Sequence, residues 1–237
     1  MPVIARTGTP WNGPRDLIGS RFACNPVCYA FTGAVMDLGY QNPLEVVDWV
    51  VYTGYPEALA AVVRGDVKFA LMGTGENFII QTMPEVDIVF WHSDILQNYS
   101  CCRLVSRREF LENNPITVRL ALQALIRAQR WYESNREGAV RLQAARMGVP
   151  EEFVAAYMLN RERYVISVDP LRNSVVRAWN ILDATGFLSE NARSINILDH
   201  INTELFEAAL NEVIKKHGSE DPAFYNEMLA FFKDQNS

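Results

Sequence analysis

Short apolar runs alternate with amphipathic stretches through the first hundred residues. The apolar runs predict four strands, which span residues 21–24, 45–52, 67–73 and 86–91. The stretches between them predict three helices, which span residues 25–39, 55–66 and 76–83. Strand–helix–strand units this short predict a mostly parallel sheet with helices on its faces.

Residues with known preferences for helix ends support this division. For helix 25–39, Asn25 is expected as the N-cap and Pro26 as the first helical residue. Gly39 is expected to end this helix, and Gly65 ends the next one in the same way.

Beyond residue 106 the apolar positions follow the helical period almost without interruption. Residues 114–135 predict a long helix, with an apolar face formed by Val118, Ala121, Leu122, Leu125, Ala128 and Tyr132. Its polar face is formed by Arg119, Gln123, Arg127 and Arg130. Further helices are predicted at 136–147, 150–159, 169–185, 203–216 and 222–233. Their apolar stripes must be buried, so these helices either form a bundle or cover a sheet that lies elsewhere.

Composition narrows the possible partners. Apolar residues make up 49% of the 237 positions, which is enough for a core. The net charge is −6 and no basic run reaches five residues, so nucleic acid is not expected as a partner. No apolar run approaches the roughly 20 residues of a membrane span. The N-terminal sequence MPVIARTGTPW lacks signal-peptide features, so the chain as given is expected to stay in the cytoplasm.

The loop after the first predicted strand is the leading candidate for a binding site. Amides in the first turn of a helix are unpaired and carry partial positive charge, which suits an anion. The amides of Val27, Cys28 and Tyr29, together with Asn25, could therefore face a carboxylate, a sulfonate or nitrate. The alternative is an ordinary capped helix, since every helix begins with such amides.

The segment GTGEN, residues 73–77, is the second candidate. It follows a strand at the edge where open α/β sheets bind ligands, and it contains Gly73, Thr74, Glu76 and Asn77. It is not a phosphate-binding P-loop, because no lysine follows. Thr53, at the end of the second predicted strand, is a weaker candidate. The alternative is a plain strand-to-helix turn, in which Glu76 favours its own helix start.

Histidines and cysteines give no metal, cofactor or catalytic prediction. His92, His200 and His217 lack metal-binding spacing, and His92 is expected as a polar loop residue. Cys24 and Cys28 form C-x-x-x-C rather than the redox motif C-x-x-C. Cys28 would lie in the first turn of a helix, which can lower the pKa of a thiol, but a buried free cysteine is more often a small apolar side chain, and that is expected here.

The adjacent cysteines Cys101 and Cys102 are expected to point apart. In an extended strand, successive side chains project from opposite faces. Two such thiols cannot share one metal ion, and a disulfide between neighbouring residues is unfavourable. Arg103 lies beside them and could pair an anionic group through both of its terminal nitrogens.

The order of motifs resembles that of the periplasmic solute-binding proteins of ABC importers for nitrate, sulfonates, taurine and thiamine precursors. The matching segments are RDLIGSRFACNP, YPEALAAVVRGDVKFALMG and CCRLVSRREFLENNPITVRLALQALIRAQRWYESNREGAVRL. The resemblance covers about Val3 to Val213 and implies a periplasmic-binding-protein type II-like α/β lobe, followed by a helical C-terminal region. Residues 1–105 are then the second lobe with its crossover strands, and residues 106–237 are helices of the first lobe, whose opening strands are missing.

The resemblance also implies a function. It implies a small anion as ligand, an ABC permease as partner, a periplasmic location despite the absent signal peptide, and binding without chemistry. The implied ligand-binding residues are Asn25, Val27, Cys28, Tyr29, Thr53, Gly73, Thr74, Glu76, Asn77 and Arg103. Closure of two lobes by a hinge would enclose the ligand.

Two other functions remain open. The same fold resembles the fungal thiamine-pyrimidine synthases, which carry a longer cysteine-rich motif than the Cys101–Cys102 pair. An intracellular ligand-sensing or regulatory module fits the absent signal peptide.

Overall fold

The computed structural model describes residues 1–237, and the chain divides into two compact units. The first unit comprises residues 1–99, 139–165 and 180–189. The second comprises residues 100–138, 166–179 and 190–237. The assignment of 106–237 to another lobe remains a prediction, and two helical segments of that range belong to the unit that contains the sheet.

A five-stranded sheet forms the centre of the first unit. Its strands are β1 (Pro2–Arg6), β2 (Arg21–Ala23), β3 (Asp48–Val50), β4 (Phe69–Leu71) and β5 (Val86–Trp91). They lie in the order β3-β2-β4-β1-β5. β2 pairs in parallel with β3 and β4, whereas β1 pairs antiparallel with β4 and β5. The predicted mostly parallel sheet is therefore confirmed, with β1 as the one strand of opposite direction.

Short helices connect these strands. They are α1 (Tyr29–Asp37), α2 (Pro43–Val46), α3 (Tyr55–Arg64), α4 (Asn77–Gln81) and α5 (His92–Ile95), with 3-10 turns η1 (Pro14–Leu17) and η2 (Thr74–Glu76). The predicted strand 45–52 is too long. Asn42 accepts a hydrogen bond from the amide of Leu44 and caps α2, so only Asp48–Val50 remains extended.

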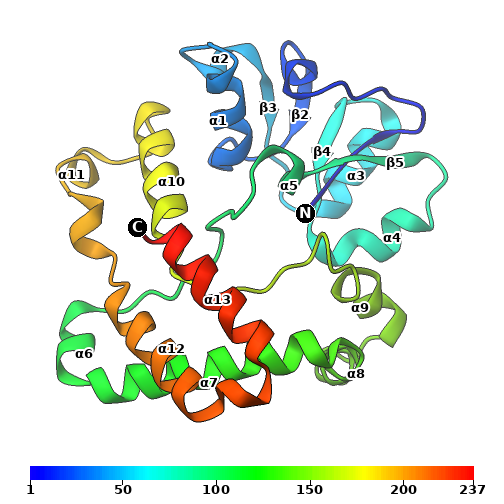
Figure 1. The fold of residues 1–237 in the computed structure, drawn as a ribbon. Coiled ribbons are helices and arrows are strands. Elements are labelled where there is room, and N and C mark those ends of the chain that lie inside the picture. The colour runs from blue at the N-terminus through cyan, green and yellow to red at the C-terminus, as the bar shows by residue number, and fades with distance from the viewer. The chain divides into compact units, whose positions relative to one another are not determined.

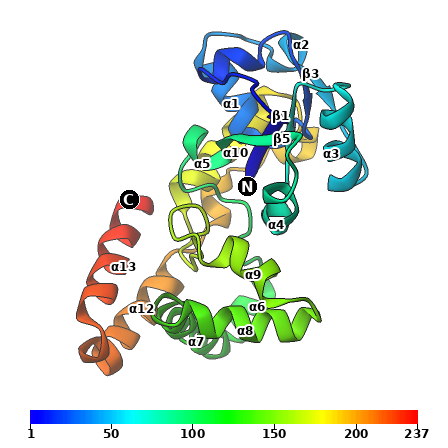
Figure 2. The same cartoon turned by 90° about the vertical axis from the view of Figure 1, so that its right-hand side faces the viewer.

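Side chains that alternate along the strands build one apolar core on each face of the sheet. Phe22 and Phe69 lie in the core that includes Phe31 of α1, whereas their neighbours Ala23 and Ala70 lie in the core that includes the apolar side of α3. Helices α1 and α3 therefore cover opposite faces of the sheet (Figure 2). The side chains at the centres of both cores are fully buried, and burial on both faces fixes the register of the short strands.

Helical segments from later in the chain complete the first unit. They comprise most of α8 (Arg136–Met147), all of α9 (Glu151–Met158) and the end of α10 (Arg172–Ala184). The ring of Phe153 in α9 lies 6.0 Å from that of Phe78 in α4, so α9 packs beside the helix that follows β4.

The second unit is helical. It contains α6 (Arg108–Asn113), α7 (Pro115–Ser134), α11 (Glu190–Arg193), α12 (Glu204–His217) and α13 (Pro222–Gln235), with η3 (Ile197–His200) and η4 (Gly218–Glu220). Helices α7 and α12 lie side by side (Figure 1). Their shared core includes Leu122 and Ile126 from α7, Phe206 and Leu210 from α12, and Tyr225 from α13.

The buried face of α7 differs from the predicted one. Ile126 is fully buried, whereas Leu125, expected in the apolar stripe, is 37% exposed. Gln123, expected on the polar face, is buried and donates a hydrogen bond to Glu212 of α12 at 2.7 Å. Helix α7 is therefore rotated about its axis relative to the prediction, so that Gln123 enters the contact with α12. Burial of this polar side chain is possible because Glu212 accepts its hydrogen bond.

Candidate ligand-binding site

The predicted ligand-binding residues of the first unit lie at one edge of the sheet. β2, β3 and β4 run in the same direction, and β5 shares it because both β4 and β5 are antiparallel to β1. The carboxyl ends of these strands are followed by Cys24, Val51, Met72 and His92. Loops at the carboxyl edge of an open α/β sheet are its usual ligand-binding position. That these residues contact a ligand remains a prediction.

The loop after β2 is a turn rather than the start of a helix. Asn25 is not the N-cap, because α1 begins at Tyr29. The side-chain oxygen of Asn25 accepts a hydrogen bond from the amide of Val27 at 3.0 Å, and its carbonyl accepts one from the amide of Cys28 at 2.9 Å. Two of the three amides expected to face an anion therefore already donate within the turn.

The loops after β3 and β4 meet through an aromatic ring. Thr53 donates from its amide and its hydroxyl to Oε2 of Glu57, at 3.2 and 3.0 Å, which fixes the entry into α3. A Cβ atom on Gly73 would lie 2.5 Å from the ring of Tyr55. Glycine at position 73 thus allows the ring from one loop to rest on the backbone of the next.

Asn77 is the most buried polar residue of the second predicted segment. It is 1% exposed at the start of α4, and its Oδ1 atom has no hydrogen-bond partner. Leaving a buried acceptor unpaired costs about 1–3 kcal/mol. A ligand that donates a hydrogen bond to this oxygen would remove that cost. Oδ1 of Asn77 is therefore a favourable partner for a ligand donor at the carboxyl edge of the sheet. Thr74 and Glu76 form η2, and the amide of Glu76 donates to the carbonyl of Gly73.

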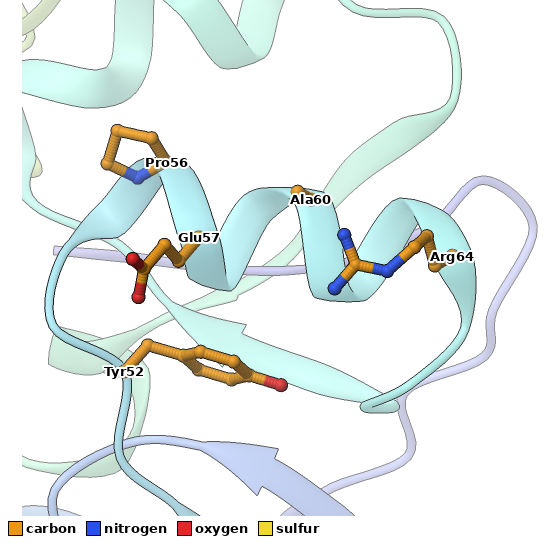
Figure 3. Close-up of a pocket in the computed structure, with 5 residues that line it drawn as sticks. All are labelled: Tyr52, Pro56, Glu57, Ala60 and Arg64. Atoms are coloured by element: carbon orange, nitrogen blue, oxygen red, sulfur yellow. The ribbon is translucent and has the colours of Figure 1, made fainter.

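A shallow groove runs along the outer side of α3 (Figure 3). It has a volume of about 400 Å³ and is lined by Tyr52, Pro56, Glu57, Ala60 and Arg64. The tyrosine ring lies beneath the helix, on the side from which Glu57 and Arg64 project (Figure 3). Glu57 is bonded to Thr53, and Arg64 pairs with Asp66 at 2.7 Å. The charged groups of the groove therefore already have partners within the chain.

A cluster of polar side chains around Cys28 was missed by the sequence interpretation. His92, expected as a polar loop residue, is 5% exposed and begins α5. Its ring lies 4.2 Å from that of Tyr99, and the Tyr99 hydroxyl lies 3.6 Å from the sulfur of Cys28. Both His92 and Cys24 directly follow a strand of the sheet. This shared position is the signal from which their proximity could have been predicted.

The cluster changes the acidity of Cys28. Its pKa is lowered to about 5. The main cause is a hydrogen bond from Cys24. Together with hydrogen bonds from His92 and Tyr99, it outweighs burial, which acts to raise the pKa of Cys28. Burial raises the pKa of Cys24 well above its usual value, so Cys24 keeps its proton.

Arg103 belongs to the second unit and has partners there. Its Nη1 atom donates to the carbonyl oxygen of Ser167 at 3.4 Å and to that of Asp169. That it also pairs an anionic ligand remains a prediction. The segment around it is irregular rather than extended, and the prediction that the neighbouring thiols point apart is wrong. The sulfurs of Cys101 and Cys102 lie 3.6 Å apart, both exposed, because no strand pairing holds their side chains on opposite faces.

The structure shows neither a cluster of metal-binding side chains nor a helix suited to span a membrane. No group of three or more His, Cys, Asp or Glu side chains is arranged to hold a metal ion. No helix combines the length and the apolar character required to cross a lipid bilayer.

Comparison with known proteins found matches among solved structures only. No protein-family model matches the sequence, and no curated protein matches it. Among solved structures, a putative periplasmic sulfonate-binding protein SsuA of a sulfonate ABC transporter from Methylobacillus flagellatus KT aligns with 92% of this chain. The alignment covers 67% of that protein, with a TM-score of 0.67 and 18% identity.

Two further structures show the range of proteins with this fold. The periplasmic aliphatic sulphonate binding protein SsuA from Escherichia coli aligns with 85% of this chain and 64% of its own, with a TM-score of 0.61 and 18% identity. The desulfurization enzyme DSZB aligns with 89% of this chain and 76% of its own, with a TM-score of 0.54 and 14% identity. The chain thus spans about two thirds of the length of both binding proteins. It has the α/β fold of the periplasmic sulfonate-binding proteins of ABC transporters, as the order of its motifs indicates.

Proposed function

We propose that this chain is a solute-binding component of an ABC importer, which binds a small anion of the nitrate, sulfonate or taurine type without chemical conversion. The observation that carries the proposal is the fold, which aligns over 92% of the chain with a sulfonate-binding protein. In this proposal an ABC permease is the protein partner, and the chain acts in the periplasm, where the compared binding proteins act.

The edge of the sheet supports the proposal chemically. Four strands end there, and the loops after β3 and β4 are in contact through Tyr55 and Gly73. Asn77 contributes a buried acceptor without a partner, and His92 contributes a buried ring nitrogen without one. Taurine carries an ammonium donor as well as a sulfonate, so it could satisfy an acceptor that nitrate could not.

Calorimetric titration with taurine, alkanesulfonates, nitrate and pyrimidines tests the proposal directly. One anion class is expected to bind, and the panel identifies which. The panel includes pyrimidines because the family that the sequence resembles also contains the binding proteins of importers for thiamine precursors. A folded chain that gives no binding heat with any member of the panel would overturn the proposal.

A pair of variants in α4 tests the position of the site. Asn77→Leu keeps the side-chain size and removes the unpaired acceptor, so it is expected to fold but to lose roughly tenfold or more in affinity for a ligand that donates to Asn77. Gln81→Leu, four residues later on the exposed side of the same helix, is the matched control and should bind normally. Equal affinity in both variants would place the ligand elsewhere.

A second candidate is an enzyme of the same fold. The observation that favours it is the alignment with the desulfurization enzyme DSZB over 89% of the chain. In the titration, an enzyme would be recognised by recovery of an altered ligand, which mass spectrometry of the released small molecule detects. Recovery of the unchanged ligand supports binding without chemistry.

A further inference from the structure

The loop after β2 holds two thiols within one turn. Cys24 directly follows the strand and is 5% exposed, whereas Cys28 caps α1 and is partly exposed. The hydrogen bond from the amide of Cys28 to the carbonyl of Asn25 closes a turn between them, and the Cys24 thiol donates to the same carbonyl at 3.4 Å. Cys28 packs against the apolar cluster that contains Cys24, so the turn gathers both side chains on one side of the sheet, although their spacing is not that of the C-x-x-C motif.

Groups from other elements surround Cys28. The ring of His92 at the start of α5 lies 4.2 Å from that of Tyr99, and the Tyr99 hydroxyl lies 3.6 Å from the sulfur of Cys28. The ring of Tyr29 stacks on that of Tyr99 at 4.4 Å. His92 is 5% exposed, and its Nε2 atom has no hydrogen-bond partner. A buried ring nitrogen without a partner, so close to a thiol, needs an explanation other than packing.

We propose that Cys24 and Cys28 form a redox-active dithiol, in which Cys28 attacks a small-molecule disulfide and Cys24 resolves the product into an intramolecular disulfide. In the first step the Cys28 thiolate bonds to one sulfur of the disulfide, and the other sulfur leaves as a thiolate. In the second, the Cys24 sulfur bonds to that of Cys28 and displaces the remaining thiolate, while the Cys24 proton passes to a released thiolate. Two protein sulfurs are oxidised, and one small-molecule disulfide is reduced to two thiolates, of which one takes the Cys24 proton and the other is protonated by water.

Accessibility and acidity assign the two roles consistently. Cys28 is partly exposed, and its lowered pKa favours the thiolate form at neutral pH. Cys24 is buried and keeps its proton, so it meets the mixed disulfide only after Cys28 has reacted. The groups that face Cys28 and govern its titration are Cys24, His92 and Tyr99.

The experiment uses the full chain with Cys101→Ser and Cys102→Ser, which removes the exposed thiols and leaves one pair. This protein is treated with 4,4′-dithiodipyridine, and its mass is measured. Loss of the mass of two hydrogen atoms is expected, together with a peptide that links Cys24 to Cys28. Two retained adducts, or no reaction while circular dichroism shows folded protein, would overturn the proposal.

Single variants in the same background test the roles. Cys24→Ala should retain a mixed disulfide on Cys28, because no resolving thiol is present. Cys28→Ser should react far more slowly, since only the buried thiol remains. Faster modification of Cys24 than of Cys28 would contradict the assignment. None of these measurements depends on ligand binding, so the proposed function can fail without affecting them.

The pH profile separates chemistry from packing. The rate of mixed-disulfide formation should reach half its maximum well below the roughly 8.5 of a free cysteine. His92→Gln removes the imidazole ring but keeps a polar side chain, and should move this midpoint upward while the disulfide still forms. A midpoint near that of a free thiol in the parent, or no shift in the variant, would count against a role for the cluster.

Discussion

The two units of the molecule hold their polar side chains in different ways. In the first, loops at the carboxyl edge of a sheet present Asn77 and His92 with buried atoms that lack partners. In the second, helices α7 and α12 enclose one apolar core, and Gln123, the buried polar side chain of their contact, is bonded across it to Glu212. The second unit also buries polar atoms without partners, among them Oδ2 of Asp169 and the Tyr225 hydroxyl, but only in the first unit do two such atoms, of Asn77 and His92, follow the carboxyl ends of sheet strands.

The largest expected effect tests the packing of the second unit. Ile126→Ala should lower the free energy of unfolding by about 3 kcal/mol, because a fully buried side chain leaves a cavity. Leu125→Ala, one position earlier and 37% exposed, should cost less than about 1 kcal/mol. Urea denaturation measures both. Equal losses would mean that α7 presents a different face to α12.

This pair of residues also explains where sequence interpretation failed. A helix turns by about 100° per residue, so an apolar stripe assigned one position away points to a different neighbour. The existence and ends of α7 followed from Pro115 and the apolar period, and they agree with the structure. Its rotation depends on Glu212, nearly ninety residues away, whose acceptance of a hydrogen bond from Gln123 no local pattern reveals.

The sheet was easier to predict because its side-chain period is two. Once a strand is recognised, its direction and its carboxyl end follow from the strand–helix–strand order. Asn25, Thr53 and Gly73 lie in loops that follow strands of the same direction, whereas their contact with a ligand stays a prediction. The Cys28 cluster was not expected, because His92 joins it only through the three-dimensional contact between α1 and α5.

The next effect concerns Arg103 in the second unit. Arg103→Ala should lower the free energy of unfolding by about 2 kcal/mol, since the carbonyls of Ser167 and Asp169 lose a charged donor. Arg103→Lys keeps the charge and should cost less. Cys102→Ser, at the exposed residue that directly precedes Arg103, is the matched control. It should leave the free energy of unfolding unchanged.

Affinity measurements on the same variants examine the predicted anion contact of Arg103. If this arginine also binds the ligand, Arg103→Ala weakens binding more than Cys102→Ser does. If Arg103→Ala lowers stability but leaves the affinity unchanged, Arg103 stabilises the second unit without contacting the ligand. The two units would then differ in function as well as in structure.

A smaller effect is expected at the sheet edge. Gly73→Ala should cost about 1 kcal/mol, because the added methyl group displaces the ring of Tyr55. Gly75→Ala is the control in the same loop, where the nearest atom would lie at an ordinary 3.9 Å. Thermal unfolding and anion titration are measured together. A loss of affinity confined to Gly73→Ala would tie the Tyr55 contact to binding, whereas identical behaviour of both variants would separate them.

The smallest effect is a pH dependence in the second unit. Burial raises the pKa of Asp169, so the folded chain binds its proton more tightly than the unfolded chain. The stability that this group contributes is present below the unfolded pKa, about 4, and is lost as the pH rises through the folded pKa. Asp169→Asn can still accept hydrogen bonds from the amide of Leu171 and from Asn236.

Because the asparagine has no proton to lose, its stability relative to the parent should improve as the pH rises from acid to neutral. Denaturation midpoints of both proteins across that range measure the difference. A difference that stays constant with pH would show that hydrogen bonds and Arg103 offset the burial of the carboxylate in full. The second unit would then bury a charge whose partners offset its cost, although Oδ2 of Asp169, like the buried polar atoms of Asn77 and His92 in the first unit, has no hydrogen-bond partner.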